Sequence, residues 1–144
     1  HPWTQDILWL QSEALKHQNS KALILTGFVP DEELPALYNL ATIYCQPSFS
    51  EGFGLPLIEA MQCGTPACYS QESCLPEIMD FNGLYFDPYS QSSIEDSLKK
   101  MWTSKKLRQK YSKLGQIRAQ FFSWKKTAIQ TLAVYKLVEI DAQK

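Results

Sequence analysis

The sequence has few of the residues that build metal centres and disulfide scaffolds. It contains four cysteines and two histidines in 144 residues, and no two cysteines form a Cys-x-x-Cys pair. Structural zinc sites use such closely spaced ligands, and small disulfide-stabilised domains are richer in cysteine. We therefore expect no metal site. We interpret the cysteines as small buried hydrophobic residues, which is compatible with a reducing cytoplasm.

Long hydrophobic runs and dinucleotide-binding signatures are missing too. No segment approaches the roughly 20 apolar residues of a membrane-spanning helix, and the first residues show no signal-peptide pattern. A Gly-x-Gly-x-x-Gly string, which would indicate an NAD-binding domain, does not follow the first predicted strand. Because the first residue is His1 and not methionine, we expect that the native N-terminus lies further upstream.

Basic residues are scarce in the first 98 residues, which contain two lysines against thirteen acidic residues. Residues 99–144 reverse this balance, with twelve Lys or Arg against two acidic residues. We favour the interpretation that these are solvated helices. The alternative is a basic surface for an anionic partner, such as a membrane leaflet or a lipid-linked acceptor. No basic cluster interleaved with aromatic residues predicts contact with nucleic acid.

Short apolar runs alternate with stretches of helical spacing along the chain. The runs at 21–26, 41–47, 66–69 and 83–87 are typical of short buried strands. Six helices are predicted. The first covers 3–17, the third begins at about Pro56, the fourth begins at Ser92 or Ser93, and the fifth covers about 107–121. The second begins after an N-cap at Asp31, with Leu34, Leu37, Tyr38 and Ala41 facing inward, and the last begins after an N-cap at Ser123. The alternation predicts an α/β fold with a doubly wound, Rossmann-like parallel sheet and a helical tail over about 90–144.

The most informative stretch begins at Glu51. Gly52, Phe53, Gly54 and Leu55 form a tight loop between a strand and a helix, and Glu59 lies one turn inside that helix. The N–H groups and the dipole of a helix N-terminus suit phosphate, and the two glycines permit positive φ and close approach of a ligand. Carboxylates accept hydrogen bonds from neighbouring hydroxyls. The pattern predicts a binder of a sugar diphosphate nucleotide, and an ordinary turn with solvated glutamates is the alternative.

The string Glu-Gly-Phe-Gly-Leu-Pro-x-x-Glu-Ala-Met resembles the Glu-x7-Glu signature of retaining GT-B-fold glycosyltransferases of the family-4 type, the glycosyl transferases group 1. Further landmarks follow the family's order over about residues 22–136, at 26–34, 63–66, 75–78, 83–88 and 122–124. The resemblance implies that residues 1–144 are the C-terminal, nucleotide-sugar-binding half of a GT-B fold. The N-terminal acceptor domain would then be absent.

The resemblance also implies a chemistry. A nucleoside-diphosphate sugar would donate a hexosyl group, with retention and without metal or other cofactor, to a glycan, a lipid-linked sugar or a small molecule. Glu51 would be the catalytic residue and hold hydroxyls of the sugar, while Gly52 and the N–H groups of Phe53, Gly54 and Leu55 would meet the sugar and diphosphate. Glu59 would bind the ribose. The expected location is cytoplasmic, with the inner membrane face as a further option, and a non-catalytic nucleotide-sugar-binding module is the alternative.

Three further expectations depend on the resemblance. Val29 would contact the nucleobase, or would simply plug the end of the sheet. The loop at 71–74 is bulkier than in relatives and would influence the choice of donor. The apolar stripe of the last helix, formed by Trp124, Ala128, Leu132, Tyr135 and Val138, would pack in the core or form an interface with the missing domain.

Overall fold

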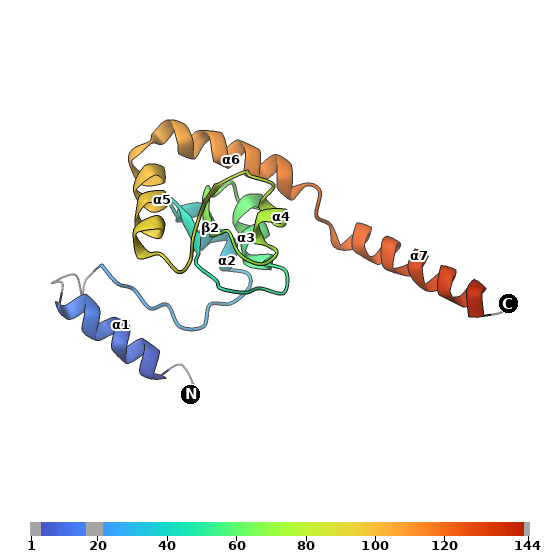
Figure 1. Ribbon diagram of the computed structural model, residues 1–144, viewed down its shortest axis with the longest axis horizontal. Helices are drawn as coiled ribbons and strands as arrows, with labels where there is room; N and C mark the ends of the chain where they lie inside the picture. The colour runs from blue at the N-terminus through green and yellow to red at the C-terminus, as the bar shows by residue number, and fades with distance from the viewer. Residues whose placement is uncertain (1–3, 17–21, 143–144) are drawn as a thin grey trace. The chain divides into compact units, whose positions relative to one another are not determined.

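The computed structural model describes residues 4–16 and 22–142, and the chain divides into two units, residues 1–31 and 32–144. In the first unit, α1 spans Thr4–Lys16, close to the predicted helix (Figure 1). Residues 22–26 were predicted as a buried strand, yet in the described structure they form none, and Ile24 is 79% exposed. This prediction was wrong because an extended segment needs a hydrogen-bonded neighbour, and the described residues provide none here. Lys21 lies outside the described residues.

The second unit is built on a three-stranded parallel sheet with the order β1-β2-β3. The strands are β1 (Tyr44–Gln46), β2 (Ala67–Ser70) and β3 (Leu84–Phe86). β1 and β3 are shorter than the apolar runs that predicted them, and β2 is shifted by one residue from its predicted run. In the register, Cys45 lies beside Cys68, and Cys68 lies beside Leu84. The prediction of a parallel α/β sheet is confirmed.

Helices cover both faces of the sheet. Successive side chains of a strand point in opposite directions, so β2 contributes apolar side chains to a core on each face. Tyr69 of β2 packs in a core with residues of α3 and α4, which include Leu57 and Leu75. Its neighbour Cys68 packs in a second core with Phe86 and with Met101 of α5. Both Tyr69 and Cys68 are fully buried. The doubly wound arrangement expected from the sequence therefore follows from the alternation along β2.

The helices of the second unit are α2 (Leu34–Leu40), α3 (Leu55–Gln62), α4 (Leu75–Met79), α5 (Gln91–Thr103), α6 (Lys105–Ala119) and α7 (Trp124–Ala142). Two predicted caps were wrong. The residue before α2 is Glu33 and not Asp31, because residues 31–33 form a turn. Ser90, and neither Ser92 nor Ser93, caps α5, and its hydroxyl accepts the N–H of Ser93. The predicted cap at Ser123 is confirmed, since its Oγ accepts the N–H of Lys126 at 3.3 Å.

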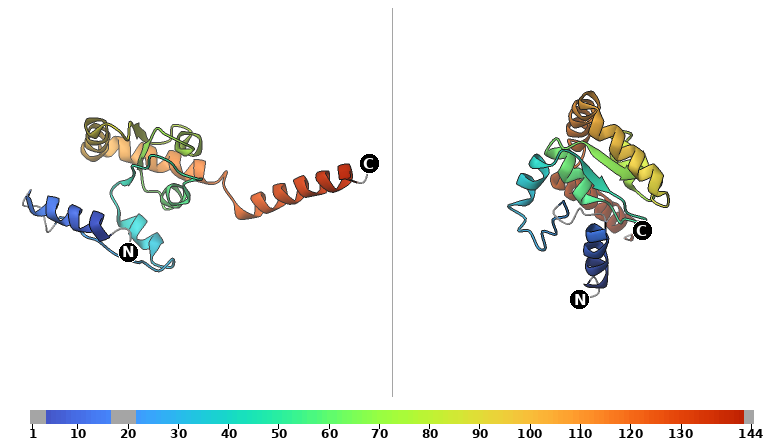
Figure 2. Two further views of the ribbon diagram at one scale, coloured as in Figure 1. Left: turned by 60° about the horizontal axis from the view of Figure 1, so that its bottom comes forward. Right: turned by 90° about the vertical axis from the view of Figure 1, so that its left-hand side faces the viewer.

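The apolar side chains of α7 are not part of the core of this chain. The helix leads away from the sheet, and every side chain from 124 to 139 is exposed (Figures 1 and 2). Trp124 is 77% exposed, and Tyr135 is 67% exposed. Helix α2 buries no residue either, although an inner face was predicted, and its Leu34 and Tyr38 are only half-buried. The core interpretation was wrong for these faces, because regular spacing predicts an apolar face but not what covers it.

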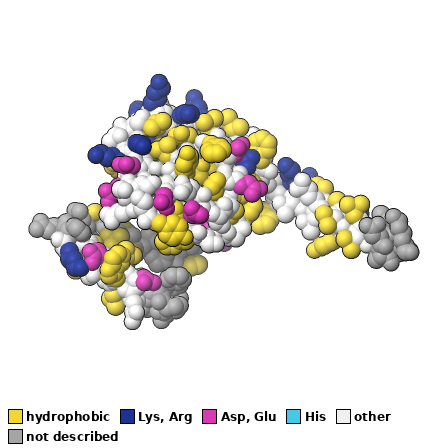
Figure 3. All heavy atoms as spheres, in the orientation of Figure 1, with side chains coloured by type: hydrophobic (Ala, Val, Ile, Leu, Met, Phe, Trp, Pro, Cys, Tyr) yellow, Lys and Arg dark blue, Asp and Glu magenta, His cyan; other side chains and the backbone are white. Residues whose placement is uncertain are grey.

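The basic residues of the C-terminal segment lie mainly on solvated helix faces. Lys and Arg side chains gather along α5 and α6 (Figure 3), and Lys105, Lys106, Lys110 and Lys113 are all exposed. This arrangement agrees with the favoured interpretation of the charge asymmetry. Within residues 4–16 and 22–142, no helix combines the length and the apolar character that crossing a bilayer requires.

Candidate functional site

The start of α3 has the geometry that the sequence predicts. Gly54 precedes the helix in the left-handed conformation, with φ +89° and ψ 45°, and Pro56 lies in the first turn. A Cβ on Gly54 would lie 2.7 Å from Leu75 Cδ2, so the site accepts only glycine without rearrangement. Gly52 differs from the prediction, because its φ is not positive. A Cβ on Gly52 would meet no atom within 4 Å, so this side of the loop is open to a ligand.

The N-terminus of α3 presents free hydrogen-bond donors. The Leu57 N–H bonds to the Gly54 carbonyl at 3.1 Å, and Pro56 has no N–H. In the part of the chain that the structure describes, no protein acceptor takes the N–H groups of Phe53, Gly54 or Leu55. Consecutive free N–H groups at the positive end of a helix attract an anion, and phosphate is the typical case.

The Glu51 carboxylate is fixed through one of its oxygens. Its Oε1 accepts a hydrogen bond from Ser48 Oγ at 2.6 Å and another from Gln46 Nε2 at 2.8 Å. The hydrogen bonds from Ser48 and then Gln46 hold the pKa of Glu51 below its ordinary value, so the group is ionised at neutral pH. Neither bond uses Oε2, which leaves that oxygen available to accept hydroxyls of a ligand.

The backbone of Glu51 is held by the loop that follows β2. Ser73 Oγ accepts the Glu51 N–H at 3.2 Å and donates to the Glu51 carbonyl at 2.9 Å. Cys74 Sγ donates to the same carbonyl at 3.5 Å. Ser73 adopts φ +60°, a conformation that is uncommon for a residue with a side chain. The loop at 71–74, predicted to influence donor choice, thus contacts Glu51 directly.

Glu59 receives a hydrogen bond from a different element. Tyr38 of α2 donates its hydroxyl to Glu59 Oε2 at 3.0 Å. The backbone of Tyr38 is held in turn, since its carbonyl accepts the Thr65 hydroxyl at 2.6 Å. Burial, followed by the hydrogen bond to Glu59, raises the pKa of Tyr38 above its ordinary value, so the phenol remains a donor at neutral pH.

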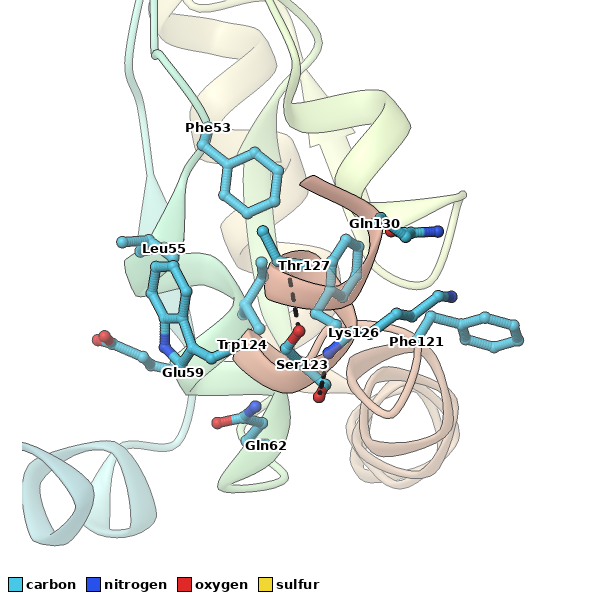
Figure 4. A pocket seen from close by; sticks show the side chains of 12 residues that line it. Phe53, Leu55, Glu59, Gln62, Phe121, Ser123, Trp124, Lys126, Thr127 and Gln130 are labelled. Carbon is cyan, nitrogen blue, oxygen red and sulfur yellow. Dashed lines mark hydrogen bonds between the residues drawn. The ribbon is translucent and has the colours of Figure 1, made fainter. Parts of the chain in front are cut away.

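A cavity of about 450 Å³ lies between α3 and the start of α7 (Figure 4). Its lining includes Phe53, Leu55 and Glu59 of the predicted site, together with Ile58, Gln62, Phe121, Phe122, Ser123, Trp124, Lys126, Thr127 and Gln130. The Glu59 carboxylate points outward from its edge (Figure 4). Neither Glu51 nor Gly52 lines this cavity. The cavity therefore adjoins only part of the predicted site.

The remaining predicted site residue is Val29. Val29 belongs to the first unit, where it is half-buried, and its contact with a nucleobase stays a prediction. Among the described residues, no group of three or more His, Cys, Asp or Glu side chains is arranged to hold a metal ion.

The family described as Glycosyl transferases group 1 matches residues 6–118. The chain belongs to this family.

Two relatives and one solved structure show how far the similarity extends. The O-antigen chain mannosyltransferase B of Escherichia coli is 37% identical over 136 residues, which are 94% of this chain and 35% of that protein. The MMP alpha-(1->4)-mannosyltransferase of Mycolicibacterium hassiacum is 37% identical over 110 residues, 74% of this chain and 27% of that protein. The crystal structure of the C-terminal domain of a glycosyl transferase group 1 family protein from Francisella tularensis matches with a TM-score of 0.76 and 28% identity, over 83% of this chain and 63% of that one.

The chain thus has the fold of the C-terminal domain of GT-B glycosyltransferases, and it spans about a third or less of the length of these two relatives. In this group 1 domain, one loop and the helix after it carry both glutamates of the Glu-x7-Glu motif. The sequence did not indicate that Gln46, Ser48 and Tyr38 bind the two carboxylates. Only the closeness of Ser48 to the motif could have pointed to one of these contacts.

Proposed function

We propose that this chain is the donor-binding domain of a retaining glycosyltransferase that uses a nucleoside-diphosphate sugar. The observation that carries the proposal is that Glu51 and Glu59 are each anchored through one carboxylate oxygen beside the free N–H groups of residues 53–55. Anchored acceptors beside an anion-binding helix N-terminus match the hydroxyls and the diphosphate of such a donor. A hexosyl group is transferred, and the names of the two relatives favour mannose.

In this proposal each group has one task. Glu51, ionised at neutral pH, accepts hydrogen bonds from hydroxyls of the transferred sugar and keeps its reacting carbon in place. Glu59 accepts hydrogen bonds from the ribose, and the N–H groups of Phe53, Gly54 and Leu55 bind the sugar and diphosphate. As the bond to the sugar breaks, negative charge grows on the departing diphosphate, where fixed N–H groups and the helix dipole stabilise it. Transfer proceeds on the face of the leaving group, whose phosphate takes the acceptor's proton, and no metal takes part.

We infer that a second, acceptor-binding domain completes the enzyme. The chain covers 35% of the Escherichia coli relative, and the exposed apolar stripe of α7 is the surface that such a domain would cover. The acceptor is a glycan, a lipid-linked sugar or a small molecule. The basic face of α6 is suited to peripheral contact with an anionic membrane surface on the cytoplasmic side.

The proposal is tested by thermal shift and calorimetry with UDP, GDP, ADP and their common sugar conjugates, including the mannose conjugates. One nucleotide is expected to stabilise the protein, and Glu59→Ala should abolish that effect. Glu51→Ala should remove only the additional stabilisation that the sugar provides. Glu95→Ala, an exposed change on α5, is the matched control and should leave binding unchanged.

The isolated chain is expected to bind donor weakly, because the family's diphosphate-clamping Arg and Lys are not found in the matching context in this sequence. The same panel is therefore repeated on the polypeptide extended by the acceptor domain. If neither form binds any nucleotide, or if Glu51→Ala and Glu59→Ala bind as the unchanged chain does, the proposal is refuted.

A further inference from the structure

A buried polar side chain lies beneath Glu51. Gln46, at the end of β1, is only 5% exposed, and both ends of its amide are used. Its Nε2 donates to Glu51 Oε1 at 2.8 Å, and its Oε1 accepts the Tyr44 hydroxyl at 3.1 Å. A buried amide with both ends bonded has one defined orientation, since a flip would turn its carbonyl oxygen toward the carboxylate.

A second tyrosine continues this set of contacts to Glu59. The rings of Tyr44 and Tyr38 meet edge to face, with centroids 5.6 Å apart and planes at 72°. Tyr38 then donates its hydroxyl to Glu59 Oε2 at 3.0 Å. Three side chains from β1 and α2 therefore connect the two glutamates, although Tyr38 and Glu59 are 21 residues apart in the sequence.

Both phenols are suited to permanent donation. Burial, followed by the charge of Glu51, raises the pKa of Tyr44 to about 12. The pKa of Tyr38 is raised as well, by burial and by Glu59. Neither hydroxyl loses its proton at neutral pH, so Tyr38 keeps donating to Glu59 and Tyr44 keeps donating to Gln46.

We propose that Tyr38, Tyr44 and Gln46 are positioning residues that orient the carboxylates of Glu59 and Glu51 as one unit. The inference rests on the proposed donor-binding function and extends it to residues that hold the carboxylates, Tyr38 and Gln46 directly and Tyr44 through Gln46. Each anchored carboxylate keeps its second oxygen for ligand hydroxyls, so the acceptors for ribose and for sugar are oriented before the donor arrives. Such preorganisation matters because small misplacements of binding groups lower activity strongly.

The first test needs no ligand. The pKa of the Glu51 carboxyl is measured by NMR titration of the 144-residue chain. Gln46→Met, which keeps the volume of the side chain, and Tyr44→Phe, which removes one oxygen, should both raise this pKa toward its ordinary value. Tyr85→Phe is the matched control. The Tyr85 side chain is 53% exposed on β3, and its hydroxyl makes no hydrogen bond among the described residues.

The second test uses the panel of UDP, GDP, ADP and their sugar conjugates. Tyr38→Phe should weaken binding about tenfold whether or not the sugar is present, because it releases the ribose-binding carboxylate. Gln46→Met should weaken binding about tenfold only for the sugar conjugates. Tyr85→Phe should change neither.

The two tests separate the failure of this inference from the failure of the proposed function. If the unchanged protein binds no nucleotide, the donor-binding function is refuted, while the titration still decides whether Gln46 and Tyr44 control Glu51. An unchanged Glu51 pKa in both Gln46→Met and Tyr44→Phe overturns the positioning role. Should Gln46→Met fail to fold, Tyr44→Phe decides alone, since it deletes a single hydroxyl.

Discussion

Replacing Gly54 with alanine is expected to damage the fold at the point where α3 begins. Two costs add. A residue with a Cβ loses about 1–2 kcal/mol in the left-handed conformation that Gly54 adopts. The new Cβ also lies 2.7 Å from Leu75 Cδ2, and because Leu75 is fully buried, forcing it aside costs about 1–3 kcal/mol.

A smaller effect opposes these costs. Alanine restricts the unfolded chain more than glycine does, which stabilises the fold by about 0.4–1 kcal/mol. The net expectation is that Gly54→Ala lowers the free energy of unfolding by about 2–4 kcal/mol. Gly52→Ala is the matched control, because its Cβ meets open space and its φ is not positive. It should change stability by no more than about 1 kcal/mol.

Urea unfolding followed by circular dichroism measures both variants against the unchanged chain. The Gly54→Ala midpoint should fall clearly below the Gly52→Ala midpoint at an unchanged slope. A third variant separates the steric cost from the backbone cost. Leu75→Val in the Gly54→Ala background should recover part of the steric cost, because it shortens the side chain that the new Cβ meets, and none of the backbone cost. Equal midpoints for the two alanine variants would refute the reasoning that the left-handed Gly54 is required for the start of α3.

Three further predictions concern stability in urea. Ser90→Ala should cost about 1 kcal/mol, because Ser90 caps α5, while Ser92→Ala should cost less than about 0.5 kcal/mol, and the reverse order would contradict the assignment of the cap. Because the hydrogen bonds to Glu51 lower its pKa, they stabilise the fold at pH values above the unfolded-state pKa of about 4.3. This stabilisation is lost as the pH falls through the folded-state pKa. Glu51→Gln should therefore flatten the acid limb of a curve of stability against pH. Arg118→Met should cost about 2–3 kcal/mol, because Arg118 donates to the carbonyls of residues 77 and 78, and Arg118→Lys should recover only part of it if the planar geometry matters.

The parts of the fold that sequence reasoning predicted correctly depend on neighbouring residues. Gly54 and Pro56 fix the start of α3 within three positions, and Ser123 caps α7 through a backbone group three residues away. The motif from Glu51 to Glu59 was found in the same way, since its spacing along one loop and one helix turn is a local property.

The wrong predictions share a different cause. Residues 22–26 have the composition of a strand but no partner among the described residues, and α7 has an apolar stripe that the described part of the chain leaves exposed. Composition and spacing predict that a segment has an apolar face. Whether that face is buried depends on which other segments pack against it in the fold. The choice of Ser90 over Ser92 as a cap was missed because three of the four residues at 90–93 are serines, and each satisfies the same local rule.

The sequence by itself determined that this chain carries a glutamate pair around a glycine loop, and hence its family and the chemistry to expect. The tertiary structure alone decided how the two carboxylates are held. Tyr38 reaches Glu59 from another helix, and Gln46 reaches Glu51 from the end of β1. Such contacts join segments that come together only when the sheet and helices pack, so no spacing along the chain encodes them.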